Sequence, residues 1–320
     1  MTKTEDEMVA FGPVPSRRLG RSLGINNIPP KSCSYSCIYC QVGPTPRQEI
    51  EPRVFFEPEE IALAVNHQVK AAQIVGEKID YLTFVPDGEP TLDNSLGKTI
   101  DLLRPLGIKI AVISNASLVW RDDVRQVLHK ADWVSLKVDT VDEKIWRQIN
   151  QPHPELRLPK ILQGIQRFAQ SYQGILSTET MLVAGINDTS ELVTGVGEFL
   201  VTIEPHTAYL AAPIRPPAQS NVHVPSEDII VQAYEMLKTK LKNVQYLIGY
   251  EGDSFSSTGD PMRDLLAITA VHPMREEAVR QFLTKAGCDW GFIQELLDQG
   301  KLKEVQFAGK RFYVRTIKTQ

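Results

Sequence analysis

Three of the four cysteines are the residues best suited to chemistry, because they lie within eight positions of one another. Cys33, Cys37 and Cys40 have the spacing C-x3-C-x2-C. Three thiolates this close on one loop can hold three irons of a cubane [4Fe–4S] cluster, which leaves the fourth iron open to a small molecule. Zinc is the main alternative metal, but a structural zinc site needs a fourth protein ligand and the loop contains no histidine.

Length and composition are those of an ordinary globular protein. The chain has 320 residues, 42% hydrophobic and 23% charged, which is enough for one large domain and a small one. A net charge of −4 gives no global signal for binding nucleic acid or an anionic membrane. No apolar run is long enough to span a membrane, and the polar, acidic start does not read as a secretory signal. We therefore expect a cytoplasmic protein.

Predicted strands alternate with predicted helices through most of the chain, and this pattern is typical of an α/β fold with a parallel sheet. About six such units favour a partial (β/α)6 TIM-type barrel over a closed eight-stranded one. The expected domains are an N-terminal segment at 1–19, a core at 20–252 and a module at 260–320. The expected strands are 22–26, 79–85, 108–113, 133–138, 175–183, 207–212 and 244–248, and the helices between them are 58–76, 95–106, 119–130, 142–149, 159–172, 191–203 and 226–241.

Distinctive residues repeatedly follow these strands. In barrel enzymes the carboxyl ends of the strands form the rim on which active sites are built. The sequence therefore predicts a single site assembled from several loops. A simple turn or a helix N-cap is the alternative reading for each loop taken alone. The loops in question contain Gly88 and Glu89, Ser114 and Asn115, Asp139, and Gly185.

The cysteine spacing, with Tyr39 just before the last cysteine, resembles the signature of the radical S-adenosylmethionine (SAM) superfamily. The resemblance implies a [4Fe–4S] cluster whose open iron binds SAM, and reductive cleavage of SAM to methionine and a 5′-deoxyadenosyl radical. Gly88-Glu89-Pro90 resembles the family's glycine–glutamate motif, although Asp87 stands where a second glycine is common. By this resemblance the residues expected near SAM are Tyr39, Gly88, Glu89, Ser114, Asn115, Asp139 (or Lys137 before it) and Gly185.

A narrower resemblance covers the run from Phe11 to Gly20 together with the Gly-Glu-Pro-Thr-Leu segment. These residues are similar to a bacterial branch of iron–sulfur oxidoreductases grouped loosely with the tRNA wyosine-base synthases. Those synthases carry a second cluster on additional cysteines, whereas here only Cys288 remains. One thiolate cannot replace three, so we do not expect the wyosine-type reaction. Cys288 is instead expected to be a small buried hydrophobic residue.

The C-terminal module has a pattern of its own. A linker at 253–260 precedes helices at 261–270 and 276–286, a third helix capped by Asp289, and a hairpin around Ala308-Gly309-Lys310. This order resembles a winged-helix domain, for which DNA binding is one interpretation. The third helix, however, carries Glu295 and Asp298 and no basic residue. We therefore favour a module that packs or docks a partner.

Three arginines precede the cysteine loop. Arg17, Arg18 and Arg21 either bind an anionic group of a substrate or cofactor or form a solvated edge. The leading hypothesis is a radical SAM oxidoreductase that modifies RNA or a nucleotide and receives electrons from a reductase or a flavodoxin- or ferredoxin-type donor. The alternatives are an iron–sulfur sensor that binds DNA through the winged helix, and an activase of a partner protein.

Overall fold

A computed structural model describes residues 9–248, 260–271 and 273–316. Its main feature is an eight-stranded sheet in which every strand pairs with its neighbours in chain order. Strands β2 to β8 are mutually parallel, and β1 is antiparallel to β2 at one edge. The strands are β1 (Ala10–Ser16), β2 (Gly20–Ile25), β3 (Tyr81–Phe84), β4 (Lys109–Ser114), β5 (Trp133–Lys137), β6 (Ile175–Met181), β7 (Thr207–Ala211) and β8 (Val244–Leu247).

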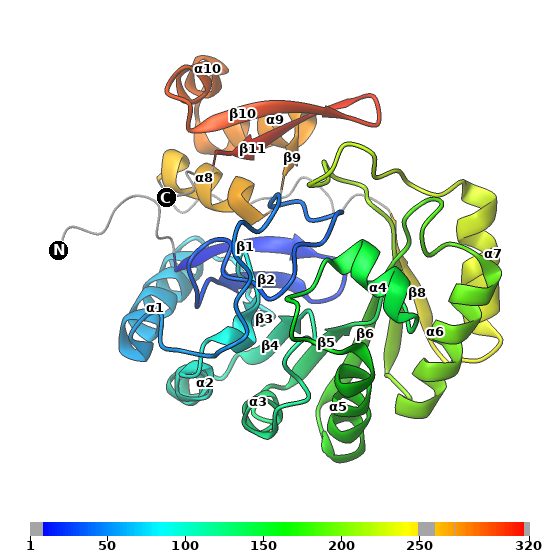
Figure 1. Cartoon of the computed structure of the whole chain (residues 1–320). Coiled ribbons are helices and arrows are strands. Elements are labelled where there is room, and N and C mark those ends of the chain that lie inside the picture. The colour runs from blue at the N-terminus through cyan, green and yellow to red at the C-terminus, as the bar shows by residue number, and fades with distance from the viewer. Residues whose placement is uncertain (1–8, 249–259, 272, 317–320) are drawn as a thin grey trace.

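Helices cover the outer face of this curled sheet, and the cysteine loop lies on the opposite side (Figure 1). Buried Val, Leu and Ile residues of strands and helices form one large core between the two layers. The predicted partial α/β barrel is confirmed, and the seven parallel strands β2 to β8 lie where the seven strands were expected. The helices are α1 (Pro58–Ile74), α2 (Leu96–Leu103), α3 (Asp122–Leu128), α4 (Glu143–Asn150), α5 (Leu158–Ser171), α6 (Ser190–Ile203) and α7 (Glu227–Lys238).

Strand β1 is a correction to the expected N-terminal segment. Residues 10–16, which we expected to lie outside the core, belong to the main sheet, and Val9 and Ala10 are buried. The signal was hidden because Gly12, Pro13 and Pro15 are poor strand residues, and proline is tolerated only where a sheet edge needs no donor. The first part of the expected tail, 1–8, lies outside the described residues.

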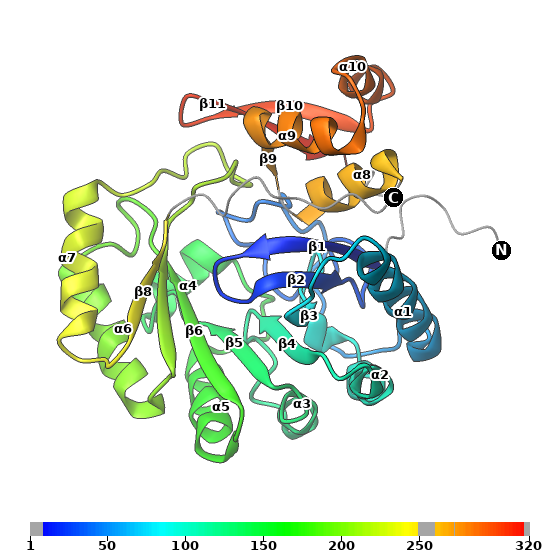
Figure 2. The ribbon, with the colours of Figure 1, turned by 180° about the vertical axis from the view of Figure 1, so that it is seen from behind.

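The turn between β1 and β2 brings the two edges of the sheet together. Arg17 follows β1, and its Nη2 donates to the main-chain oxygen of Leu247 at the end of β8, at 2.9 Å. Figure 2 shows this turn reaching toward β6 and β8. The open side of the partial barrel is therefore bridged by side chains from the hairpin turn.

The C-terminal elements form a small unit with its own core. They are α8 (Pro261–Val271), β9 (Met274–Arg275), α9 (Glu276–Ala286), α10 (Gly291–Asp298), β10 (Leu302–Phe307) and β11 (Lys310–Arg315). The expected helices and hairpin are present, β9 adds a third strand, and α8 packs against β1. Residue 290, not Asp289, is the N-cap of α10, and no side chain caps it. The winged-helix assignment stays a prediction, and most of the expected linker, 253–259, lies outside the described residues.

Among the described residues, no helix is long and apolar enough to cross a membrane.

Candidate cluster and cofactor site

The cysteine loop follows β2 and is held in place by main-chain hydrogen bonds to several elements. Glu89 N donates to Ser32 O at 2.9 Å, which ties the loop to the segment after β3. Ser36 N donates to the oxygen of Asn150 at 3.1 Å, which ties it to the end of α4. The loop has little regular structure of its own, so these contacts fix where its cysteines point.

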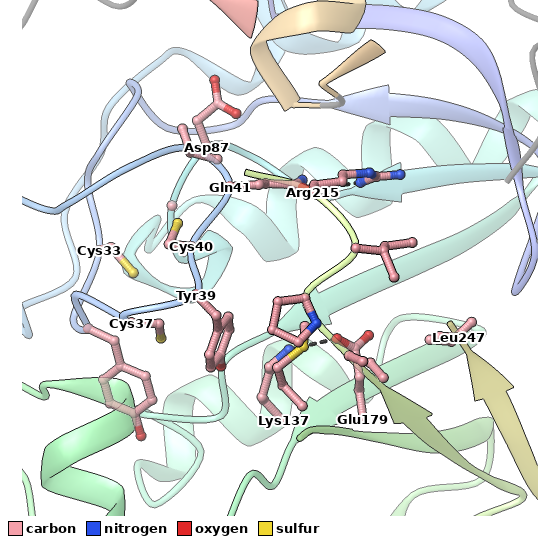
Figure 3. Close-up of a pocket in the computed structure, with 18 of the residues that line it drawn as sticks. Cys33, Cys37, Tyr39, Cys40, Gln41, Asp87, Lys137, Glu179, Arg215 and Leu247 are labelled. Carbon is pink, nitrogen blue, oxygen red and sulfur yellow. Dashed lines mark hydrogen bonds and ion pairs between the residues drawn. The ribbon is translucent and has the colours of Figure 1, made fainter. Parts of the chain in front are cut away.

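All three cysteines line one cavity of about 290 Å³ at the carboxyl ends of the strands. Tyr39 and Gly88 line it as well, so the structure brings five of the predicted residues together. In Figure 3 the cysteines lie on one side, Lys137 and Glu179 lie on the other, and the Tyr39 ring stands between them. The rest of the lining comes from both sides of the barrel and includes Arg17, Arg18, Lys31, Gln41, Asp87, Met181, Ile214, Arg215 and Leu247.

The cysteine thiols suit a cluster better than a single ion. Among the described residues, no three His, Cys, Asp or Glu side chains converge closely enough to hold one metal ion. Cubane ligands bind three different irons, so they stand farther apart than the ligands of one ion. Burial raises the pKa of the Cys33 thiol, and it raises the pKa of Cys37 to about 12. Such thiols lose their protons when iron binds to the sulfur in place of the proton, as cluster binding requires.

Two asparagine amides donate to the sulfur atoms of these cysteines. Asn115 Nδ2 lies 3.5 Å from Cys33 Sγ, and Asn150 Nδ2 lies 3.4 Å from Cys37 Sγ. Hydrogen bonds to ligand sulfurs stabilise negative charge there and tune the reduction potential of a cluster. The sequence pointed to Asn115 for a different reason and gave no signal for Asn150, which is simply the last residue of α4.

Gly88 and Glu89 fit tightly against the cysteine loop. A Cβ on Gly88 would lie 2.0 Å from Ser32 O, so only glycine allows this approach. The Glu89 side chain is fully buried and accepts four hydrogen bonds, from Thr91 N, Thr91 Oγ1, Ser114 Oγ and Asn115 N at 2.6–3.1 Å. Its carboxylate therefore joins the segments after β3 and β4 behind Cys33, and it does not line the cavity.

The remaining predicted residues lie behind or beside the cavity. Ser114 is buried against Glu89, and Asp139 accepts hydrogen bonds from Tyr39 Oη, from Asn150 Nδ2 at 2.7 Å and from Met181 N at 2.8 Å. Both residues thus support the residues that line the cavity. Gly185 lies in an exposed turn after β6 with a φ of 70°, outside the cavity lining. SAM contacts from Ser114, Asn115, Asp139 and Gly185 stay predictions.

The wall opposite the cysteines is built from charged side chains. Lys137 Nζ lies 2.6 Å from Glu179 Oε1, and Arg18 Nη1 pairs with Glu179 Oε2. Burial lowers the pKa of Lys137, but Glu179 outweighs it and leaves that pKa raised. Burial also opposes ionisation of Glu179, but Lys137 and Arg18 hold its pKa at about 2. All three groups are therefore charged at neutral pH. The one charged residue of strand β6, Glu179, was the available signal for this site.

The three predicted arginines separate in the structure. Arg17 and Arg18 line the cavity, whereas Arg21 pairs with Glu77 outside it, and its backbone N–H donates to Asp80. Arg21 is therefore removed from the predicted anion site. Arg215, after β7, also lines the cavity, where its Nη1 donates to Gln41 Oε1 at 2.8 Å.

Asp87, which the sequence marked only as standing in place of a second glycine, lines the cavity. Burial raises its pKa to about 6, and Lys31 and Arg315 act against that rise. Arg315 belongs to β11, so charge from the C-terminal unit reaches the cavity wall. Cys288, in contrast, packs at the edge of the C-terminal core and does not line the cavity.

Comparison with known proteins places this geometry in a family. Residues 27–193 match the Radical SAM superfamily. The chain is 47% identical over 98% of its length to UPF0026 protein MJ1312 of Methanocaldococcus jannaschii, and it covers 97% of that protein. It is also 36% identical over 62% of its length to a UPF0026 protein of Helicobacter pylori, covering 64% of that chain.

Two solved structures share the fold. The structure of TYW1 with a lysine-pyruvate adduct bound has a TM-score of 0.51 and 20% identity, over 69% of this chain and 74% of that one. A radical SAM methyltransferase from Sphaerobacter thermophilus has a TM-score of 0.53 and 13% identity, over 72% of this chain and 66% of that one. At such low identity these similarities concern the fold of the barrel.

Proposed function

This chain belongs to the radical SAM superfamily and is an enzyme, and we propose that Cys33, Cys37 and Cys40 hold its cluster at the cysteine side of the cavity. The superfamily uses a [4Fe–4S] cluster and SAM, and when bound these supply a 5′-deoxyadenosyl radical that abstracts hydrogen from a substrate. The observation that carries the assignment is the convergence of the three thiols on one cavity at the rim of the barrel.

The residues of the chain have separate tasks in this proposal. The main chain at Gly88 lies beside the cysteine loop, where it can contact the amino group of SAM. Tyr39, held by Asp139 and Asn150, separates the thiols from the charged wall. Lys31 lies near all three thiols, and its positive charge offsets part of their negative charge. The amides of Asn115 and Asn150 stabilise the sulfurs.

RNA or nucleotide modification is the proposed class of reaction, supported by the cationic side chains that line the cavity. A reductase or a flavodoxin- or ferredoxin-type protein is the proposed electron donor. An activase of a partner protein would use the same residues and is the second candidate. The DNA-binding sensor has no support from the relatives or from α10, which has acidic residues and no basic ones. We also propose that the protein acts in the cytoplasm.

The test is anaerobic reconstitution followed by iron and product analysis. The full chain should bind close to four irons and, once reduced, should convert SAM slowly to 5′-deoxyadenosine and methionine. Changing Cys33, Cys37 or Cys40 to Ala should abolish both, whereas the matched variant Cys288→Ala should keep both, since Cys288 lies outside the cavity. Loss of iron from Cys288→Ala would contradict the three-thiolate site.

A further inference from the structure

The lining of the cavity as a whole holds more positive than negative charge. Of the described residues that line the cavity, the positive ones are Arg17, Arg18, Lys31, Lys137 and Arg215, and the negative ones are Asp87 and Glu179. The chain as a whole carries −4, so this excess is local. Three of the positive residues, Arg17, Arg18 and Lys137, lie where the hairpin turn meets β5 and β6.

A buried group of three charges dominates the wall opposite the cysteines. Lys137 and Arg18 share the single carboxylate of Glu179, so the group keeps a net charge of +1. The side chains are only 15–18% exposed. The Arg18 Nε is buried and has no hydrogen-bond partner among the described residues. Burying a net charge is costly unless a counter-charge completes the group.

We propose that Arg18, Lys137 and Glu179 form a binding subsite for the oxyanion, phosphate or carboxylate, of a small-molecule substrate. The proposal rests on the radical SAM function, because that function places SAM at the cysteine side and the substrate beyond it. The Tyr39 ring lies between the two sides, with Lys137 Nζ 4.9 Å from its centroid. An anion held by the charged group would thus lie across Tyr39 from the cluster. The anion would share the cavity of about 290 Å³ with SAM and the cluster, so the space left beside Tyr39 suits a small molecule or a single nucleotide better than a polymer.

Glu179 makes the proposal sharply testable, because its removal and the removal of Arg18 should have opposite effects. Arg18→Gln lowers the net charge of the group to zero, whereas Glu179→Gln raises it to +2 and keeps an amide oxygen for Lys137. A merely structural role would weaken binding in both variants. Arg18→Lys keeps the charge, and Arg21→Gln is the matched control, because Arg21 lies on the next strand and pairs outside the cavity.

The experiment is anaerobic calorimetry on the cluster-loaded full chain with SAM present. The probes are uridine 5′-monophosphate, succinate, uridine and a ten-nucleotide single-stranded RNA. Uridine 5′-monophosphate or succinate should bind at least tenfold more tightly than neutral uridine. Whichever of the two binds more tightly shows whether the subsite prefers a phosphate or a carboxylate. Arg18→Gln should weaken that binding at least fivefold, Glu179→Gln should strengthen it, and Arg18→Lys and Arg21→Gln should stay near the wild type.

Three outcomes would overturn the subsite. Equal weakening by Arg18→Gln and Glu179→Gln would make the group structural. An equal loss of affinity for SAM in Arg18→Gln would assign the group to the carboxylate of SAM. Tighter binding of the RNA than of either small anion would replace the small molecule with a polymer. Because binding is measured without turnover, failure to cleave SAM would count against the proposed function alone.

Discussion

Both walls of the cavity contain polar groups that are removed from water, and each wall satisfies these groups in a different way. Behind the cysteines, the buried carboxylate of Glu89 is satisfied by four uncharged donors, and neutral amides reach two of the sulfurs. Across the cavity, Glu179 is satisfied by two full cations. Uncharged donors fix the positions of Glu89 and the sulfurs without adding positive charge, whereas a cationic group attracts an anion. The first wall therefore suits holding a cluster, and the second suits binding what reacts with it.

The largest effect should come from removing the Glu89 carboxylate, which accepts the four hydrogen bonds behind the cysteines. Glu89→Ala leaves four buried donors without an acceptor, at about 1–3 kcal/mol each, so the free energy of unfolding should fall by about 4 kcal/mol or more. Because Asn115 and the cysteine loop lose their anchor, the folded fraction should also lose iron. Chemical denaturation and iron analysis would measure the two losses.

Asp93→Ala is the matched control for this variant. Asp93 is also a buried carboxylate on the segment after β3. It accepts hydrogen bonds from Ser95 and from Asn27, which lies just after β2 and before the cysteines, but its carboxylate holds neither the cysteine ligands nor Asn115. It should destabilise the fold and leave the iron content of the folded fraction unchanged. Equal iron loss in both variants would mean that Glu89 stabilises the fold in general and has no special effect on the cluster site.

Gly88→Val should impair SAM binding more than Glu89→Ala does, because the valine side chain would displace Ser32 O.

A smaller effect is expected at the sulfur atoms. Asn150→Leu removes the amide from Cys37 Sγ, which destabilises the more negative, reduced cluster and lowers its midpoint potential. A tenfold change in the ratio of reduced to oxidised cluster corresponds to about 59 mV for one electron, and we expect a shift of about this size or less. Spectroscopic redox titration would measure it. Asn27→Leu removes an equally buried amide that touches no sulfur, so a similar shift in that variant would contradict the assignment.

How far the sequence predicted this site depends on the kind of signal each residue gave. Cysteine spacing is local, so Cys33, Cys37 and Cys40 were found, as was the alternation of strands and helices that positions them. Asn150 and Glu179 were not found, because they reach the site only through tertiary packing, with the partners Cys37 and Arg18 lying 113 and 161 positions away. Ser114 and Asp139 were placed correctly after their strands, but sequence alone could not show that their side chains turn toward protein partners.

The last effect concerns Asp87, a buried carboxylate that lines the cavity near Lys31. Burial raises its pKa from 3.8 to about 6, so the folded chain keeps this proton after the unfolded chain has lost it. Stability from this group is thus present below about pH 4 and is lost as the pH rises to about 6. A shift of about two units corresponds to about 3 kcal/mol, and this net figure already includes the attraction to Lys31 and Arg315.

Thermal unfolding of Asp87→Asn at several pH values would test this sign. The variant should be more stable than the wild type by up to about 3 kcal/mol at pH 7 and about equal to it at pH 4, because only the ionised carboxylate is unfavourable. A loss of stability at pH 7 would mean that Lys31 and Arg315 outweigh burial, and the wall at Asp87 would then belong with the charged side of the comparison.

The bond between Arg17 and Leu247 also has a consequence for synthesis on the ribosome. The two residues are 230 positions apart, and at about 5–20 residues per second the second follows the first by about 10–50 seconds. For most of that interval the nascent chain already contains its three clustered cysteines, yet the hairpin turn has no β8 to close against. Any iron delivered during translation meets a site that is open along one side, and the last barrel strand to be made is the one that shuts it.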